Sequence, residues 1–312
     1  MPNPTWISGT GSANPLGISV QGKQDGFTGN VTIDSISMDP YMPPTEKRWF
    51  EIYTLQNTTL TYTIKSSLPY VTVSSKQGEL ISPGTKSDAR VFVNVDWKAA
   101  PAGVITADLS ITTNKNSLVA HVRIPINKTM IATGFKGHVA SNGYVSIEAE
   151  HYVRSKSVST GTWQHIPTYG RTLSGMHILP FTGPSQTVAS APSLEYDFYT
   201  FSTTTATSIT VYIGPTMNVD QTRPIRYGIS IDGKTTTVVK PVLDYVLGPP
   251  GSNWQNAIEG IWTTKTSLGT LSEGKHTLSV TALEPNLVFE KFVIDVGGLK
   301  RSYLGPPESY RA

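Results

Sequence analysis

Short segments in which apolar and polar residues alternate recur along this sequence. In residues 89–97 every odd-numbered position is apolar, from Ala89 through three valines to Trp97. Successive side chains of a strand point to opposite faces, so this period of two gathers the apolar residues on one face. The pattern predicts a half-buried β-strand. Similar patterns occur at residues 48–54, 60–64 and 105–111.

The residues between these segments favour turns. The 312 residues include 27 glycines and 22 prolines, together with many serines and threonines. Glycine and proline interrupt helices and mark turns and loops. The sequence therefore predicts an all-β protein. A chain of 312 residues is long enough for two domains, each with its own core.

We expect the first domain to span residues 1–135 and to be an immunoglobulin-like antiparallel β-sandwich. It holds roughly seven strand-like segments at a spacing of 8 to 12 residues, as such sandwiches do. No catalytic set is evident in it. His121 alternates with apolar neighbours in one of these segments, and we expect it to be structural. The section from residue 68 to residue 103 resembles small sandwich modules found as spacers in secreted carbohydrate-active enzymes, and this resemblance implies a spacer role for the domain.

We expect the second domain to span residues 136–312 and to be a jelly-roll sandwich. Its strand-like segments are residues 193–201, 208–213, 225–231, 235–239, 274–280 and 287–294. Residues 163–177 have no steady periodicity and are predicted to form a loop. Residues 254–262 fit either a short helix or a bent strand.

Glu148 and Glu150 carry the most specific chemistry. Residues two apart on a strand share a face, with Cα atoms about 6.6 Å apart. Two such carboxylates can converge on a cation, and Ca²⁺ prefers oxygen ligands. Two alternatives stay open: solvated acids at a sheet edge, or a catalytic acid pair, although neighbours on one strand do not easily flank a bond.

The predicted loop at residues 163–177 is rich in aromatic and polar side chains. Aromatic faces beside hydrogen-bond donors suit a sugar, which offers an apolar face and a rim of hydroxyls. The alternative is that the aromatic residues close the end of the sandwich. The candidate carbohydrate-binding residues are Trp163, His165, Tyr169, Arg171 and, from a later segment, Trp254.

Several classes of function are excluded. The chain has no cysteine, so disulfides, thiolate metal sites and thiol nucleophiles are absent. The net charge is +3, and no basic run favours a nucleic-acid partner. No apolar run reaches the ~20 residues of a membrane span. Nucleotide-binding and common hydrolase motifs are also missing.

The sequence also bears on localisation. Three Asn-x-Ser/Thr triplets, at Asn30, Asn57 and Asn127, suit a secreted protein. The first residues lack the apolar core of a signal peptide. We expect an extracellular protein whose signal is not present in this chain.

A series of motifs in the second domain resembles one known family, the family 115 glycoside hydrolases, which are xylan α-1,2-glucuronidases. The similarity is to their C-terminal region. The motifs, in order, are Ile147-Glu-Ala-Glu150, Tyr169-Gly-Arg-Thr172, Ser174-Gly-Met176, Leu194-Glu-Tyr-Asp-Phe198, Arg223 through Gly233, Gly274-Lys-His-Thr-Leu278, Ile294-Asp-Val-Gly-Gly298 and Ser302-Tyr-Leu-Gly-Pro-Pro-Glu-Ser309.

This resemblance implies that the catalytic residues lie in a different domain. The catalytic carboxylates of the family lie in an upstream α/β barrel, and no part of this chain alternates strands with long helices. Glu148, Glu150 and the late-strand Glu290 also resemble the calcium ligands of carbohydrate-binding sandwiches of families 6 and 35, where the third ligand is usually Asp. The resemblance thus implies structural Ca²⁺.

Three hypotheses follow. The chain is a non-catalytic accessory region that supports or dimerises a xylan-debranching enzyme, with an upstream or separate glucuronidase domain as partner. Alternatively, it is a stand-alone lectin-like protein for uronic-acid-substituted polysaccharides such as glucuronoxylan, with Arg171 facing the uronate. The third is an enzyme that uses Glu148 or Glu150, although we do not expect this chain to be catalytic alone. Neither nucleic acid nor membrane is expected as a partner.

Overall fold

The computed structural model describes residues 14–312 except 24, 85, 116–117, 217, 219, 221, 243–261 and 301. The chain divides into two compact units. The first comprises the chain up to Pro40 together with Thr45–Met130, and the second comprises Tyr41–Pro44 and Ile131–Ala312. Trp254, and with it most of the segment 254–262, lies outside the described residues.

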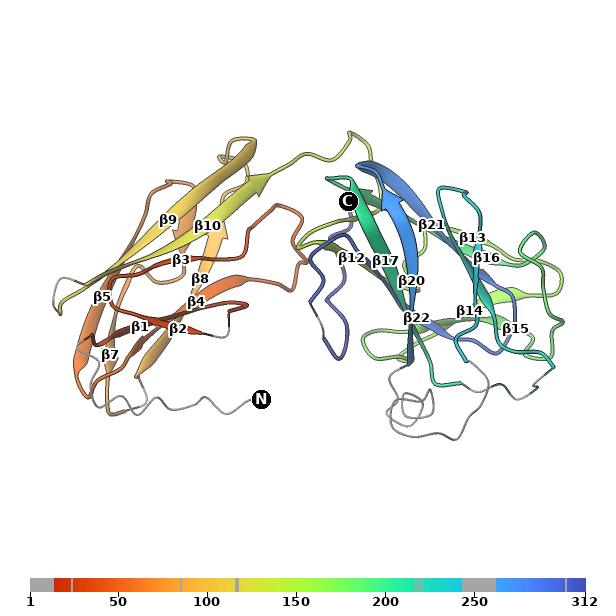
Figure 1. Cartoon of the computed structure of the whole chain (residues 1–312), viewed down its shortest axis with the longest axis horizontal. Coiled ribbons are helices and arrows are strands. Elements are labelled where there is room, and N and C mark those ends of the chain that lie inside the picture. The colour runs from red at the N-terminus through yellow and green to blue at the C-terminus, as the bar shows by residue number, and fades with distance from the viewer. Residues whose placement is uncertain are drawn as a thin grey trace. The chain divides into compact units, whose positions relative to one another are not determined.

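The first unit is a sandwich of two five-stranded sheets (Figure 1). One sheet has the order β2 (Gly26–Thr28), β1 (Leu16–Val20), β4 (Arg48–Thr54), β8 (Asp88–Val95), β6 (Val71–Val73). The other has the order β3 (Thr32–Asp34), β10 (Val119–Lys128), β9 (Gly103–Thr113), β5 (Thr59–Ser66), β7 (Gln77–Ile81). The described pairs are antiparallel except β3 with β10, which is parallel.

Alternation builds the core of the first unit. In β5, every second residue is buried, from Leu60 through Tyr62 to Ile64. β9 and β10 show the same alternation over part of their length. His121 lies on the outer side of β10, with its Nδ1 2.9 Å from Asp108 Oδ2, so it has a structural partner. The immunoglobulin-like sandwich predicted from the period of two is confirmed.

The second unit is a sandwich of two six-stranded sheets. One has the order β11 (His138–Val139), β16 (Ser193–Thr200), β21 (Gly274–Ala282), β18 (Tyr227–Ile231), β19 (Thr237–Val239), with β13 (Arg154–Lys156) also paired to β16. The other has the order β14 (Thr162–Ile166), β15 (Gly175–Leu179), β22 (Phe289–Asp295), β17 (Thr204–Ile213), β20 (Trp262–Leu271), with β12 (Tyr144–Glu148) also paired to β22.

The core between these sheets is aromatic and aliphatic. Tyr196, Tyr227, Phe289 and Phe292 are fully buried in it. Tyr227 and Phe289 meet edge to face at 5.4 Å between ring centroids, an arrangement that aromatic quadrupoles favour. The jelly-roll type of sandwich is confirmed. In the described part of the chain, no helix is long and apolar enough to cross a membrane.

One element differs from the sequence prediction. Residues 163–177 were expected to form a loop, but their two ends form the hairpin strands β14 and β15, in register from Thr162 with Leu179 to Ile166 with Gly175. β14 is the edge strand of its sheet and no residue in it is fully buried. An edge strand without a buried face has no reason to alternate, so the period of two is absent there.

A β-bulge shapes β22. Against β17, Lys291 pairs with Tyr212 and Phe289 pairs with Ile213, so Glu290 is the extra residue. Phe289 and Phe292 both enter the core. The bulge therefore turns Glu290 and Lys291, the two charged residues between them, away from the apolar core.

A two-residue turn aligns β12. Ser141 and Tyr144 form an antiparallel bridge across Asn142 and Gly143, whose φ angles are 56° and 79°. Asn-Gly is the preferred pair where both turn residues need positive φ. The backbone at Gly143 is also packed closely against Gly298, because a Cβ added at Gly143 would lie 2.4 Å from the Cα of Gly298.

We predict that Gly143→Ala lowers the free energy of unfolding of the second unit by clearly more than Gly233→Ala. Both glycines have positive φ, which costs about 1–2 kcal/mol in a residue with a Cβ. Nothing lies within 4 Å of a Cβ at Gly233, whereas Gly143→Ala adds a clash with backbone. Urea unfolding measures both variants. Equal losses would contradict the role given to the Gly298 contact.

Candidate functional site

The stretch at residues 148–151 begins at the last residue of β12. β12 pairs with β22 so that Glu148 lies opposite Lys291. Lys291 Nζ is 3.0 Å from Glu148 Oε1, and both side chains are almost fully buried. Thr172, in the connection between β14 and β15, donates to the same oxygen at 2.7 Å. Glu148 is therefore a buried and paired acid.

The bulge places a second acid beside this pair. Glu290 Oε2 lies 4.0 Å from Arg171 Nε, and the Arg171 guanidinium lies over the Tyr212 ring at 5.3 Å. Burial raises the pKa of Glu290, and the nearby Arg171 opposes that rise. Two carboxylates and two cations thus form a compact buried group beside β12, β17 and β22.

Glu150 faces the same connection further along. Its Oε2 accepts hydrogen bonds from Ser174 Oγ and, at 2.5 Å, from His165 Nε2. Its Oε1 lies 3.5 Å from His151 Nε2. Glu148 and Glu150 therefore tie one connection, residues 167–174, to the end of β12.

The predicted calcium ligands Glu148, Glu150 and Glu290 do not form a single group of ligand atoms within 4.8 Å of one another among the described residues. Glu148 and Glu290 each have one buried oxygen without a hydrogen-bond partner. These oxygens are the atoms that a cation would use. Cations already lie beside both acids, namely Lys291 and Arg171. Calcium at these residues stays a prediction.

The predicted sugar-binding residues face different ways. Trp163 packs on Phe289 of the core at 6.1 Å between ring centroids. Tyr169 fills the space beside Gly175 and Gly214, where an added Cβ would meet its ring at 2.9 Å and its hydroxyl more closely still. The Arg171 side chain is 11% exposed, and only His165, at 47%, is largely open to solvent. The structure brings Trp163, His165, Tyr169 and Arg171 to one end of the sheet, whereas Trp254 lies outside the described residues. Sugar contact by these residues stays a prediction.

The C-terminal tail lies along the second unit. Ser309 N donates to Ser146 O, and Ser146 N donates to Ser309 Oγ, each at 2.9 Å. Lys291 Nζ donates to Pro306 O at 3.2 Å. Ala312 N donates to Gly137 O at 2.9 Å. The tail thereby covers the buried charges next to β12.

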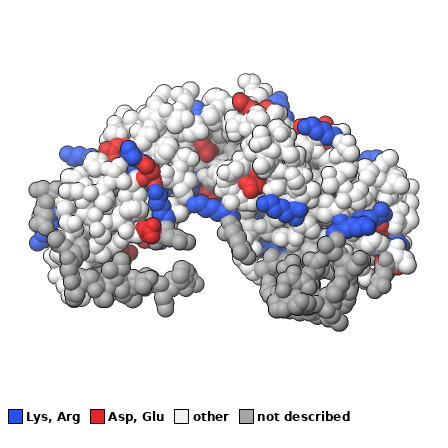
Figure 2. Space-filling model, in the orientation of Figure 1, with Lys and Arg blue, Asp and Glu red and all other residues white. Residues whose placement is uncertain are grey.

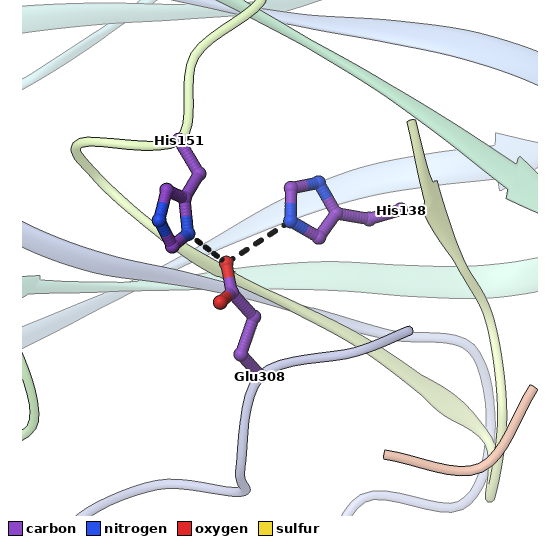
Figure 3. Close-up of side chains that lie close together, drawn as sticks. All are labelled: His138, His151 and Glu308. Carbon is purple, nitrogen blue, oxygen red and sulfur yellow. Dashed lines mark hydrogen bonds and ion pairs between the residues drawn. The ribbon is translucent and has the colours of Figure 1, made fainter. Parts of the chain in front are cut away.

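Glu308 is the polar centre of this tail (Figure 3). Its Oε1 lies 3.0 Å from His138 Nε2 and 2.7 Å from His151 Nδ1, and it accepts the backbone N–H of Glu148 at 3.1 Å. Burial alone would raise the pKa of Glu308, but the bonds from the two histidines outweigh it and lower the pKa to about 2. The bond to Glu308 in turn raises the pKa of His151.

A separate pocket of about 440 Å³ opens on the other sheet. It is lined by Gly134, Phe135, Lys136, Arg154, Asp197, Asp232, Lys275, His276 and Thr277. The acids in it are engaged: Arg154 binds Asp197 through both terminal nitrogens, and His276 Nδ1 lies 2.8 Å from Asp232. Among the described residues, Lys136 and Lys275 have no ion-pair partner.

Charge elsewhere on the visible surface is mixed. Figure 2 shows basic and acidic residues scattered among large uncharged areas, without one continuous patch of either sign. Such a surface gives no electrostatic argument for a nucleic-acid partner.

Sequence reasoning did not identify the histidine cluster or the pocket. His151 directly follows Glu150, and Glu308 lies in the Pro-Pro-Glu-Ser tail, so both stood within motifs of interest. Their 157-residue separation gave no spacing signal. The pocket residues come from three strands, β13, β16 and β21, and from two segments between strands, which no local pattern connects.

The fold and the site define the second unit as a jelly-roll sandwich with a polar network but no described catalytic set. Residues 137–308 match the glycosyl hydrolase family 115 C-terminal domain. The match spans more than half of the chain, and the chain belongs to this family. The resemblance found in the sequence motifs is thereby confirmed.

Parts of the chain are similar to several solved structures. One is a family GH115 4-O-methyl-α-glucuronidase with specificity for decorated arabinogalactans, at 14% identity and a TM-score of 0.33, covering 46% of this chain and 17% of that one. Another is the C-terminal family 6 carbohydrate-binding module of LamC from Zobellia galactanivorans, at 15% identity and a TM-score of 0.31, covering 49% and 98%. A third is CsCBM6-3 from Clostridium stercorarium, at 14% and 0.30, covering 53% and 100%. No curated protein matches the chain.

We predict that Lys291→Met destabilises the second unit by about 3–5 kcal/mol, because it leaves the buried Glu148 without its cation. The matched control is Lys265→Met, which changes an exposed lysine of β20. Urea unfolding of both variants measures the difference. A loss as small as that of the control would show that the pair is not a structural requirement.

A second prediction concerns pH. Burial lowers the pKa of His177, which stacks on Phe181 at 5.0 Å, below its ordinary value of 6.5. The unfolded chain therefore binds a proton at His177 more readily, and stability falls as pH drops below about 6.5. His177→Leu should weaken this fall in thermal melts between about pH 7.5 and pH 5.5. His121→Gln, in the first unit, is the control, and an unchanged slope in His177→Leu would contradict the prediction.

Proposed function

We propose that this chain is a non-catalytic accessory region of a xylan α-1,2-glucuronidase and that it supports the catalytic domain. The observation that carries the proposal is the match of residues 137–308 to the C-terminal domain of family 115. The described residues form strands, turns and connections, so a barrel of alternating strands and helices is not among them. The bond-cleaving carboxylates are therefore assigned to an upstream or separate domain.

The tail supports this role. Tyr303 and Leu304 are 65% and 46% exposed, although the residues that follow them are fixed to the sandwich. An anchored segment with exposed apolar side chains suits contact with another domain. The same side chains would serve a homodimer, which is the alternative form of the proposal. Xylan is an extracellular polymer, so a secreted protein is proposed with it.

Binding of a uronic-acid-substituted xylan is the second candidate function. One observation favours it: the pocket near β16 and β21 presents Lys136 and Lys275, whose charges no described ion pair offsets. Lysine ammonium groups suit a sugar carboxylate through charge-assisted hydrogen bonds. Phe135 adds an apolar surface, with Lys275 Nζ 6.0 Å from its ring. The β14–β15 hairpin, which carries Trp163 and His165, is the competing surface.

Titration with aldouronic and neutral xylo-oligosaccharides tests the second candidate. If the pocket binds the uronate, Lys275→Ala should weaken binding of the aldouronic ligand by about tenfold or more, whereas His165→Ala, in the β14–β15 hairpin, should bind it as tightly as the wild type. Lys265→Ala, on the other sheet, is the matched control. If Trp163→Ala or His165→Ala alone abolishes binding, the β14–β15 hairpin is the site, and absence of heat with every ligand rules out this candidate.

Two further measurements test the accessory role. Sedimentation across a range of concentrations reports whether the chain self-associates, and Tyr303→Ser should weaken any association that uses the tail. Assay of the purified chain for release of 4-O-methylglucuronic acid should detect none. Release that is lost in Glu148→Gln or Glu150→Gln would overturn the non-catalytic proposal.

A further inference from the structure

The cluster of His138, His151 and Glu308 has the composition of a metal site. One nitrogen of each histidine and one carboxylate oxygen all lie within 4.8 Å of one another. Two imidazoles and a carboxylate are ligands that Zn²⁺ binds readily at about 2.0–2.2 Å. In a tetrahedral site with such bonds, ligand atoms are roughly 3.3–3.6 Å apart. The observed separations of 3.0 and 2.7 Å from Glu308 Oε1 therefore need only a small opening.

Each ligand is fixed by backbone that does not depend on a metal. His138 lies in β11, and the next residue, Val139, donates its N–H to Tyr310 O at 2.9 Å. His151 N donates to Glu148 O at 3.0 Å, which closes the turn after β12. Ser309, next to Glu308, donates its N–H to Ser146 O and accepts the N–H of Ser146 at its Oγ. The three segments thus hold the ligands together before any ion arrives.

Outer contacts orient two of the ligands. Glu150 Oε1 lies 3.5 Å from His151 Nε2, so the other nitrogen of that ring faces the cluster. Metal-binding histidines commonly have such a carboxylate behind them. The Glu148 N–H holds Oε1 of Glu308, and the described bonds to this carboxylate all end on Oε1. Oε1 is therefore the oxygen that the protein holds toward both rings, and it is the one placed to bind an ion.

The cluster is also accessible on one side. The His138 side chain is fully buried, whereas those of His151 and Glu308 are 33% and 26% exposed. Figure 3 shows both rings pointing at the Glu308 carboxylate from different segments. An ion can enter past His151, and water can complete its coordination.

We propose that His138, His151 and Glu308 bind a divalent transition-metal ion of the Zn²⁺ type, which fastens the C-terminal tail to the second sandwich. Binding displaces the protons that the two imidazoles place toward Glu308. The ion then links β11, the turn after β12 and the tail. This site is distinct from the predicted calcium ligands Glu148, Glu150 and Glu290, and it does not depend on the proposed sugar-binding function.

Titration of chelator-treated, tag-free protein with Zn²⁺ tests the proposal. We expect one ion per chain and a rise in the melting temperature of the second unit, since a ligand that binds only the folded state stabilises it. His151→Gln should weaken binding by about tenfold or more, as should Glu308→Gln. His121→Gln is the matched control, because His121 faces only Asp108, in the first unit.

Cobalt gives a readout that does not depend on the variants. Co²⁺ in a site with two imidazoles and a carboxylate should produce visible absorption bands that Zn²⁺ removes by competition. Absence of binding by both ions, or equal binding by His151→Gln and wild type, would overturn the proposal and leave a metal-free histidine and carboxylate clasp. Adding Ca²⁺ alone should not raise the melting temperature through this cluster.

Discussion

The burial of the ion pair between Glu148 and Lys291 is the constraint on which the second sandwich depends. The pair lies beside β12 and β22, and both side chains are almost completely removed from solvent. Taking such charges out of water costs several kcal/mol per ion unless hydrogen bonds and opposite charges replace the lost hydration. Thr172 and Pro306 O supply those bonds. The connection between β14 and β15 and the C-terminal tail are therefore needed as covers.

The same covers carry the rest of the polar network. Residues 148–151 contact the connection through Thr172 and Ser174, and they contact the tail through Glu308. The β-bulge at Glu290 adds a second acid, which Arg171 balances. A segment of four residues thus determines how two distant parts of the chain lie on one sheet.

The surfaces proposed for binding differ from the network of buried polar residues. Arg171 is largely buried against Glu290, and Trp163 packs on the core, so both have structural partners. The pocket with Lys136 and Lys275 and the exposed residues of the tail are open to solvent. The chain belongs to the family 115 C-terminal domain. An accessory role agrees with this sandwich, because most of its charged groups hold the β14–β15 connection and the C-terminal tail in place. Any partner would contact the surfaces that the network leaves open.

The period of two predicted the strands whose one face is buried, as in β5 and β9, and the all-β class followed from it. It failed for β14, an edge strand in which Trp163 packs on the core but no residue is fully buried. Two core phenylalanines three residues apart, Phe289 and Phe292, do signal the bulge, but only once their burial is known. Glu148 and Glu150 were singled out by strand spacing, but β12 ends at Glu148 and Glu150 lies in the turn that follows, and their partners could not be predicted.

By itself, the sequence determined the all-β class, the two-sandwich organisation and the family, because local periodicity and motif order are properties of neighbouring residues. Only the tertiary structure decided which side chains meet. Glu308 lies 157 residues beyond His151 and 170 beyond His138, and no local pattern encodes such a contact. The chain brings them together because β11, β12 and the tail each satisfy backbone hydrogen bonds on the same sandwich, and the carboxylate then falls between the two rings.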